Sequence, residues 1–132
     1  MQKTSLPSVQ KMIFKTLSKY EPLMNEVDGV FTDSVVGNPQ KYISIGEDTV
    51  NDWSNCVFYG EEVTHTLHVW HSGSSYECKQ IMSLVIEALT QPSLVIDDGF
   101  YIEKVRLDFL QVIDDPENWR HGIVRFRFLI SQ

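Results

Sequence analysis

Three histidines at equal intervals are the residues whose spacing most suggests chemistry. His65, His68 and His71 are separated by three residues each, and three imidazoles are a common ligand set for a catalytic zinc ion. They lie in a segment of alternating residue types, which predicts a β-strand. On a strand, His65 and His71 share one face about 20 Å apart, and His68 points to the other face. We therefore interpret them as strand histidines, because a metal site would need a bulge or a helix here.

A group of acidic residues beside a lysine is the second candidate for chemistry. Asp97 and Asp98 precede Glu103 and Lys104, and metal-dependent nucleases bring carboxylates and a lysine to one metal ion. Adjacent residues on a strand project to opposite faces, so Glu103 and Lys104 would not converge. We interpret residues 97–99 as a turn that leads into a solvated strand face.

The two cysteines offer no nucleophile. Cys78 falls on the apolar stripe of a predicted helix, and Cys56 lies in an acidic segment, where a thiolate is not favoured. The sequence also holds no glycine-rich phosphate loop, no GxSxG and no HExxH. We therefore expect no catalytic residues, no cofactor and no metal, and we expect that the chain is not an enzyme.

Length and charge narrow the class of protein. The 132 residues, 42 % of them hydrophobic, suit a single domain spanning residues 1–132. The 11 basic against 18 acidic residues give a net charge of −7, which argues against nonspecific nucleic-acid binding and against a polybasic membrane anchor. Apolar runs are far shorter than the roughly 20 residues that span a bilayer. With two cysteines and no signal-peptide pattern, we expect synthesis in a cytoplasm.

Two helices are expected from apolar residues at helical spacing. The first covers residues 5–20, with Ser5 as the N-cap, Pro7 in the first turn and Pro22 beyond its end. The second ends at Pro92 and follows a stop at residues 73–75. Its apolar stripe consists of Cys78, Ile81, Met82, Val85 and Leu89.

Alternating residues predict the strands. We expect short strands at residues 30–33 and 42–46, a long loop at 47–59 and a strand at 61–71. The last third predicts a hairpin around the turn at 114–118. One of its strands places Val105, Leu107, Phe109 and Ile113 on one face, and the other places Val124, Phe126, Phe128 and Ile130 inward. The fold class is α+β: a mostly antiparallel, mixed sheet of four to six strands with two helices on one face.

The charges are unevenly distributed along the chain. Residues 42–72 contain no Lys or Arg and five acidic residues, together with Trp53, Phe58 and Tyr59. Such a segment is either a solvated loop with its aromatics folded back on the sheet, or a contact surface for another protein.

The order of these segments resembles the small tail-completion proteins of long-tailed bacteriophages and prophages, which are akin to tail terminators and tail-to-head joining proteins. The similar stretches are residues 42–48 (YISIGED), 52–54 (DWS), 65–70 (HTLHVW), the helix through 77–89, the Asp-rich turn at 114–115, and 120–128 (RHGIVRFRF). The likeness covers residues 5–130 and rests on their order and on the total length. The glycines usual near the first strand are replaced by residues 25–29 (NEVDG).

This resemblance implies a structural virion protein without catalytic residues. Such proteins form a ring, generally a hexamer, at the head-proximal end of the tail tube, where they stop tube growth and dock to the head. It implies a homo-oligomer whose partners are the tail tube protein and the head–tail connector proteins. The protein would assemble in the bacterial host cytoplasm and end in the virion tail. The implied sheet with helices on one face agrees with the elements predicted from the residues.

An acidic segment has a physical purpose in a conduit for DNA, because it repels phosphates and lets the duplex slide. A ring also needs two different contact patches on each subunit, and outward arginines would meet a neighbour's acidic loop. We therefore expect eight residues near the ring lumen or a contact between subunits: Glu47, Asp48, Asp52, Trp53, Glu61, Glu62, Arg125 and Arg127.

Two other functions stay open on the residues alone. A monomeric adaptor or regulatory module would use the same acidic, aromatic segment to hold a partner. A small enzyme would use the histidines with zinc, and stoichiometric metal in the purified protein would identify it.

Overall fold

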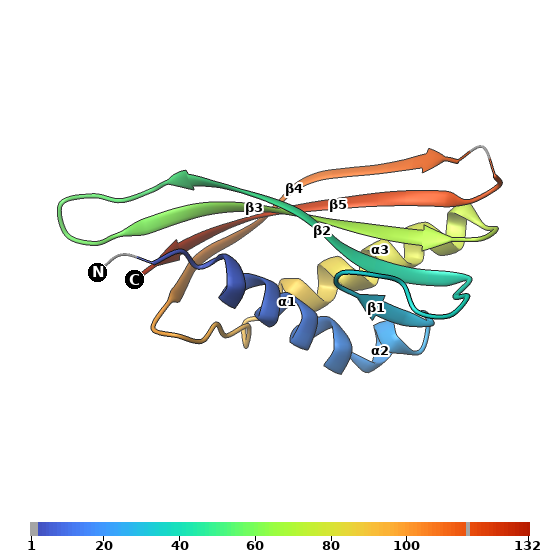
Figure 1. Ribbon diagram of the computed structural model, residues 1–132, viewed down its shortest axis with the longest axis horizontal. Coiled ribbons are helices and arrows are strands. Elements are labelled where there is room, and N and C mark those ends of the chain that lie inside the picture. The colour runs from blue at the N-terminus through green and yellow to red at the C-terminus, as the bar shows by residue number, and fades with distance from the viewer. Residues whose placement is uncertain (1–2, 116) are drawn as a thin grey trace.

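The chain folds into one layer of β-sheet and one layer of helices (Figure 1). The computed structural model describes residues 3–115 and 117–132. Its five strands are β1 (Gly29–Phe31), β2 (Lys41–Asp52), β3 (Gly60–His71), β4 (Tyr101–Asp114) and β5 (Arg120–Ser131), in the sheet order β1-β2-β3-β5-β4. β1 runs parallel to β2, and the other pairs are antiparallel. The predicted α+β class with a mixed, mostly antiparallel sheet is confirmed.

All helices lie against the same face of the sheet (Figure 1). They are α1 (Leu6–Lys19), α2 (Glu21–Met24) and α3 (Ser75–Leu89). We call this face the helix-covered face and the other one the open face. The short α2 was not predicted. Pro22 was expected only to lie beyond the end of the first helix, but it also lies in the first turn of α2, where a missing N–H group costs no hydrogen bond. None of the helices in the described ranges is long and apolar enough to cross a bilayer.

The core fills the space between the helices and the helix-covered face. Apolar side chains at helical spacing on α1 and α3 meet alternating residues of β3 and β5, as predicted. The fully buried members include Val9, Ile13, Leu17, Val63, Leu67, Val85, Leu89, Val124, Phe126 and Phe128. Each buried side chain of this size contributes roughly 1.5–3 kcal/mol, so this interface between layers holds the fold together.

β2 is longer than the sequence pattern indicated. The expected loop at 47–59 is wrong for residues 47–52, which continue β2; residues 48–52 pair with residues 61–65 of β3. A bulge between Ile45 and Asp48 shifts the alternation, so that Asp48 and Val50 take the helix-covered side. The sequence pattern did not reveal this part of the strand, because its residues are mostly polar and the bulge interrupts the alternation. The loop itself is limited to residues 53–59.

β4 also departs from the predicted pattern. Two irregularities, at Glu103 and Asp108, interrupt its pairing with β5. Leu107 pairs with Phe126 and Phe109 pairs with Arg125, which face opposite sides of β5. The prediction that Val105, Leu107, Phe109 and Ile113 share one face is therefore wrong, because each inserted residue reverses the faces beyond it.

The connection between β4 and β5 is a tight turn, as expected, although Pro116 lies outside the described residues. Asp115 accepts a hydrogen bond from Asn118 N–H at 3.1 Å and donates its own N–H to the Trp119 carbonyl at 2.8 Å. Asn118 has a φ of 66°, which asparagine tolerates better than most residues. This turn and the β2–β3 loop lie at opposite ends of the sheet (Figure 1).

Candidate assembly interface

Two of the strand histidines, His65 and His71, have their side chains on the helix-covered face. His65 is fully buried and its Nδ1 forms a short contact with Asp48, across the bulged part of β2. His71 Nδ1 accepts the N–H groups of Gly73 and Ser74, each at 3.1 Å, while its Nε2 lies 2.8 Å from a Glu77 carboxylate oxygen. These contacts fix the bulge and the start of α3.

The third histidine, His68, lies on the open face in a different cluster. Its Nδ1 is 2.6 Å from His121 Nε2, and its Nε2 is 3.1 Å from a Glu47 oxygen. The His121 ring in turn stacks on Trp70 at 3.9 Å between centroids. The hydrogen bond from His68 lowers the pKa of Glu47, and burial followed by the charge of His68 lowers the pKa of His121.

The three histidines therefore have separate roles and do not converge. In residues 3–115 and 117–132 no three His, Cys, Asp or Glu side chains are grouped to hold a metal ion. Of the acidic group considered from sequence, Asp97 pairs with Lys11 at 3.4 Å. Asp98 accepts a 2.6 Å hydrogen bond from Ser8, and Glu103 accepts one from Ser131 at 2.5 Å. These contacts join segments of the fold to one another.

Glu61, which the sequence placed near a lumen or contact, lies inside its own subunit. Only 4 % of it is exposed. Its carboxylate accepts hydrogen bonds from Ser5 N–H at 2.7 Å, Ser5 Oγ at 2.6 Å, Thr4 Oγ1 at 3.3 Å and Tyr59 Oη at 2.9 Å. Ser5 thus precedes α1 as predicted, but its hydroxyl serves Glu61 and makes no side-chain cap. Glu61 fastens the start of α1 to β3, and we leave it out of the interface proposed below.

The two outward arginines of β5 already contact side chains of their own subunit. Arg127 lies 3.0 Å from Asp108 and 4.0 Å from Glu62. Arg125 donates to Thr66 Oγ1 at 3.2 Å, and its guanidinium lies 5.0 Å from the centre of the Phe109 ring. Both lie on the open face, as the alternation predicted.

The loop joining β2 and β3 projects beyond the helices at one end of the sheet (Figure 1). Trp53 packs against Phe58 with 5.4 Å between ring centres, so this aromatic is partly folded back. Asp52 is exposed and accepts a 2.6 Å hydrogen bond from Ser54 Oγ. Val57 at the tip is 90 % exposed. The tip thus offers an acidic residue and an apolar residue to any neighbouring molecule.

One edge of the sheet is an apolar surface that sequence reasoning missed. β4 pairs only with β5, and its five exposed large apolar residues are Tyr101, Leu107, Phe109, Leu110 and Ile113. Between β4 and α3 lies a groove of about 670 Å³, lined in part by Met82, Ile86, Leu110 and Val112. A long exposed apolar edge strand is a site where another chain adds on. Strand order, which the sequence pattern does not reveal, creates this edge.

The opposite edge carries a second, different surface. β1 covers only residues 42–44 of β2, so residues 45–52 of β2 form the sheet edge beyond it. Next to this edge lies a groove of about 660 Å³, lined by residues of α1 that include Leu6 and Phe14, and by Thr32 and Asp48. Both edges thus have a free strand beside a groove, but the β4 edge is apolar and the β2 edge is largely polar and acidic.

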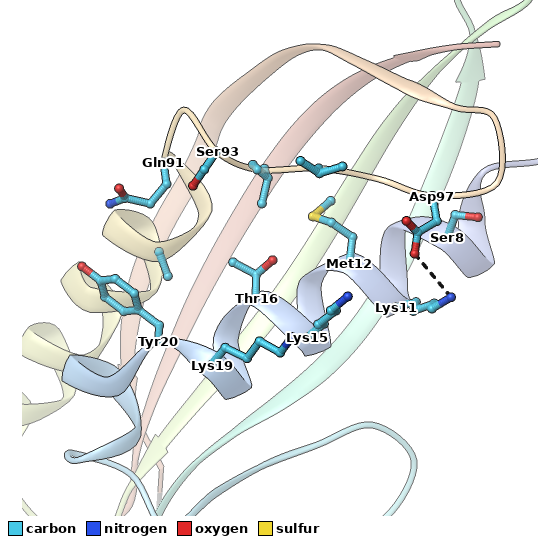
Figure 2. A pocket seen from close by; sticks show the side chains of 13 residues that line it. Ser8, Lys11, Met12, Lys15, Thr16, Lys19, Tyr20, Gln91, Ser93 and Asp97 are labelled. Atoms are coloured by element: carbon cyan, nitrogen blue, oxygen red, sulfur yellow. Dashed lines mark ion pairs between the residues drawn. The ribbon is translucent and has the colours of Figure 1, made fainter.

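A third groove, of about 330 Å³, lies on the helix side between α1 and residues 91–97 (Figure 2). Lys11, Lys15 and Lys19 follow one another along its α1 wall, and Lys11 reaches Asp97. These lysines are exposed to solvent, and Asp97 is the acidic residue that faces them in the lining of this groove.

The described residues therefore lack a converging metal-binding group and carry extensive surfaces for contact with other chains. An apolar edge strand, a second free sheet edge and a projecting acidic hairpin are the features of a structural subunit that works by assembly.

The comparison with known proteins identifies the family. The family model for tail completion protein gp17 matches residues 11–131, and the chain belongs to this family. Tail completion protein gp17 of Bacillus phage SPP1 is 33 % identical over 125 residues, which cover 94 % of this chain and 92 % of that protein.

Solved structures agree with this assignment. The structure of bacteriophage SPP1 gp17 protein matches with a TM-score of 0.67 at 31 % identity, over 96 % of this chain and 91 % of that one. A chain from a structure titled as the virion of a native gene transfer agent particle matches with a TM-score of 0.85 at 17 % identity, over 99 % and 100 %. The second match establishes the similarity of fold.

The resemblance read from the sequence is thus confirmed. The chain is a structural protein of the phage tail that functions in tail completion, and membership in this family identifies it as a non-enzyme.

Proposed function

We propose that this chain forms a ring of six copies at the head-proximal end of the tail tube, where it stops tube growth and joins the tail to the head. Membership in the tail completion family carries this proposal. Its partners are the tail tube protein on one side of the ring and the head–tail connector proteins on the other. Assembly takes place in the host cytoplasm.

The two unlike sheet edges support a ring. A ring of identical subunits needs a heterologous contact, in which one patch of each copy meets a different patch of the next. The apolar edge at β4 and the second edge at residues 45–52 of β2 supply two such patches. A single self-complementary patch would instead stop assembly at two copies.

The acidic β2–β3 hairpin suits a position near the lumen or at a contact between subunits. Between residues 42 and 72 the chain has no Lys or Arg, so this hairpin repels DNA phosphates and favours passage over binding. Its exposed acids are Glu47 and Asp52, with Asp48, Glu62 and Trp53 partly covered beside them. Arg125 and Arg127, held by contacts within the subunit, line the adjoining open face.

Deletion of the gene with complementation tests the proposed function. We expect a lysate of the deletion strain to contain filled heads and separate tails by electron microscopy, with tails of uncontrolled length or without the end structure. The wild-type gene should restore joined particles. Joined, infectious particles at wild-type yield in the deletion strain would contradict the proposal.

Variants then test the hairpin within the same experiment. Asp52→Lys introduces a cation at the projecting tip and should lower the yield of DNA-filled joined particles. Glu117→Lys, an equal charge change at the exposed β4–β5 turn, is the matched control and should complement fully.

A further inference from the structure

We propose that neighbouring copies in the ring join their sheets edge to edge, with β4 of one copy lying along residues 45–52 of β2 in the next. In this contact Lys104 and Arg106 of one copy face Glu47 of the other. The inference rests on the proposed ring and specifies its contact.

The backbone at both edges is available for this pairing. β4 forms its ladder with β5 alone, and β2 beyond residue 44 forms its ladder with β3 alone. Each strand thus leaves one row of N–H and C=O groups directed away from the sheet. Pairing of two such edges satisfies these groups with a partner's backbone.

The side chains of β4 and the grooves beside both edges favour burial against a partner. β4 has large apolar residues exposed along its length, among them Tyr101 at 65 % and Leu110 at 45 %. Each edge is accompanied by a groove of similar size against a helix, about 670 Å³ at α3 and about 660 Å³ at α1. Burial of this apolar surface in the contact provides a favourable term of about 25 cal/mol per Å² removed from water.

Two exposed basic residues of β4, Lys104 and Arg106, remain free to pair with a neighbouring copy. Arg106 pairs directly with Arg127 of β5 in the sheet register, and like charges in that position repel each other. Arg127 has Asp108 and Glu62 as partners. Among the described residues neither Arg106 nor Lys104 has a carboxylate within 4.0 Å, so β4 presents an uncompensated basic stripe on the open face.

The other edge provides the complementary charge. The Glu47 side chain is 69 % exposed and lies on the open face beside His68. Residues 42–72 contain no Lys or Arg, and Arg125 of β5, whose charge also acts on Glu47, donates its Nε hydrogen to Thr66. When β4 of one copy lies along β2 of the next with the open faces continuous, the basic stripe and Glu47 lie on the same side of the joint sheet.

The symmetric alternative does not build a ring. Two copies that joined through β4 alone would form a self-complementary contact that closes after two copies. The pairing of β4 with β2 leaves one free edge of each kind at the ends of a growing chain of subunits. Further subunits can therefore add through the same contact until the ring closes.

Charge reversal with rescue tests this contact. An equal mixture of ¹⁵N-labelled and unlabelled chains is treated at about 1 mM with a carbodiimide, which links carboxylates directly to lysine amines in contact. Mass spectrometry then identifies links that join a labelled to an unlabelled chain. We expect a mixed-isotope link between Lys104 and Glu47 in the wild type.

The variants have defined outcomes. Lys104→Glu with Arg106→Glu, and separately Glu47→Lys, should each lower the total mixed-isotope linkage at least tenfold. All three substitutions together should restore it through a link between positions 104 and 47 with the charges exchanged. Lys15→Glu with Lys19→Glu on α1 makes the same charge change at exposed sites away from both edges and should leave the linkage unchanged.

Three results would overturn the edge contact: mixed-isotope links only between other residues, no mixed-isotope links in the wild type, or wild-type linkage in the Lys104→Glu, Arg106→Glu variant. None of these results bears on head-to-tail joining, which the gene deletion measures independently. Failure of the contact and failure of the proposed function are therefore distinguishable.

Discussion

Replacement of Glu61 by glutamine should destabilise the protein more than any other loss of a single charge in the acidic segment. Its carboxylate is buried between α1 and β3 and accepts two hydrogen bonds from Ser5 and one from Tyr59, all at 2.9 Å or less. Glutamine keeps the shape and one acceptor oxygen. It removes the charge and places an NH₂ group among donors.

The structure sets the size of this effect. A hydrogen bond to a charged group contributes about 1.5–3 kcal/mol, and a buried donor left without a partner costs about 1–3 kcal/mol. Because glutamine retains part of the network, we expect Glu61→Gln to lower the free energy of unfolding by about 2–4 kcal/mol. Glu62→Gln is the matched control: its oxygen lies 4.0 Å from Arg127 on the open face, and it should cost no more than about 1 kcal/mol.

Urea unfolding monitored by tryptophan fluorescence measures both variants. With a slope of about 2 kcal/mol per molar urea, the Glu61→Gln midpoint should fall by about 1–2 M. A double-mutant cycle with Ser5→Ala should give a coupling of at least about 1 kcal/mol. A Glu61→Gln midpoint equal to that of Glu62→Gln, or additive effects with Ser5→Ala, would refute the assigned anchoring role.

The pH dependence of this effect has a definite sign. Burial raises the pKa of Glu61, and hydrogen bonds from Ser5, Tyr59 and Thr4 outweigh it, so the pKa lies below its ordinary value of 4.5. A group with a lowered pKa stabilises the fold above the unfolded value and loses this contribution as pH falls through the folded value. The stability difference between wild type and Glu61→Gln should be full at pH 7 and shrink progressively below about pH 4.5.

Three further predictions follow from the packing and the contacts. Burial and the charge of His68 lower the pKa of His121 below 6.5, although the charges of Asp115 and Glu47 act in the opposite direction. The stability of the wild type should therefore fall as the pH drops below 6.5. His121→Phe should reduce this decline, which urea midpoints measured from pH 7 to 5.5 would show. Gly46→Ala would bring a Cβ within 2.8 Å of the Thr66 carbonyl and should cost about 1–3 kcal/mol in urea unfolding, an expectation that an unchanged midpoint would contradict. Light scattering over a concentration series should detect a species near six times 15.2 kDa. Leu110→Asp on β4 should dissociate this species, whereas Val95→Asp, at an exposed position in the loop before β4, should not.

The alternation of residues predicts those parts of the fold in which one face is continuously buried. β5 has an unbroken period of two, and its inward residues were identified correctly, as was the apolar stripe of α3. The period fails where the backbone inserts a residue. Beyond the bulges in β2 and β4, each residue points to the opposite face from the one that strict alternation predicts. For this reason the second half of β2 was predicted as a loop, and Phe109 was assigned to the wrong face.

The site was less accessible to prediction because it depends on contacts between distant segments. The burial of Glu61 follows from Ser5, which is 56 residues away in sequence, and the pairing of Arg127 follows from Asp108 on the neighbouring strand. The exposure of β4 depends on its position at the end of the sheet order. Local patterns reveal a strand's faces, but they do not reveal which strand lies at the edge.

Counting and locating the protein in isolated tails tests the central claim most directly. Quantitative mass spectrometry against an isotope-labelled standard of this chain would give its copy number per tail, and gold-labelled antibody would give its position by electron microscopy. The account predicts six copies per tail and a label confined to the head-proximal end. A label along the tube or at the distal tip, or a copy number that scales with tail length, would contradict it.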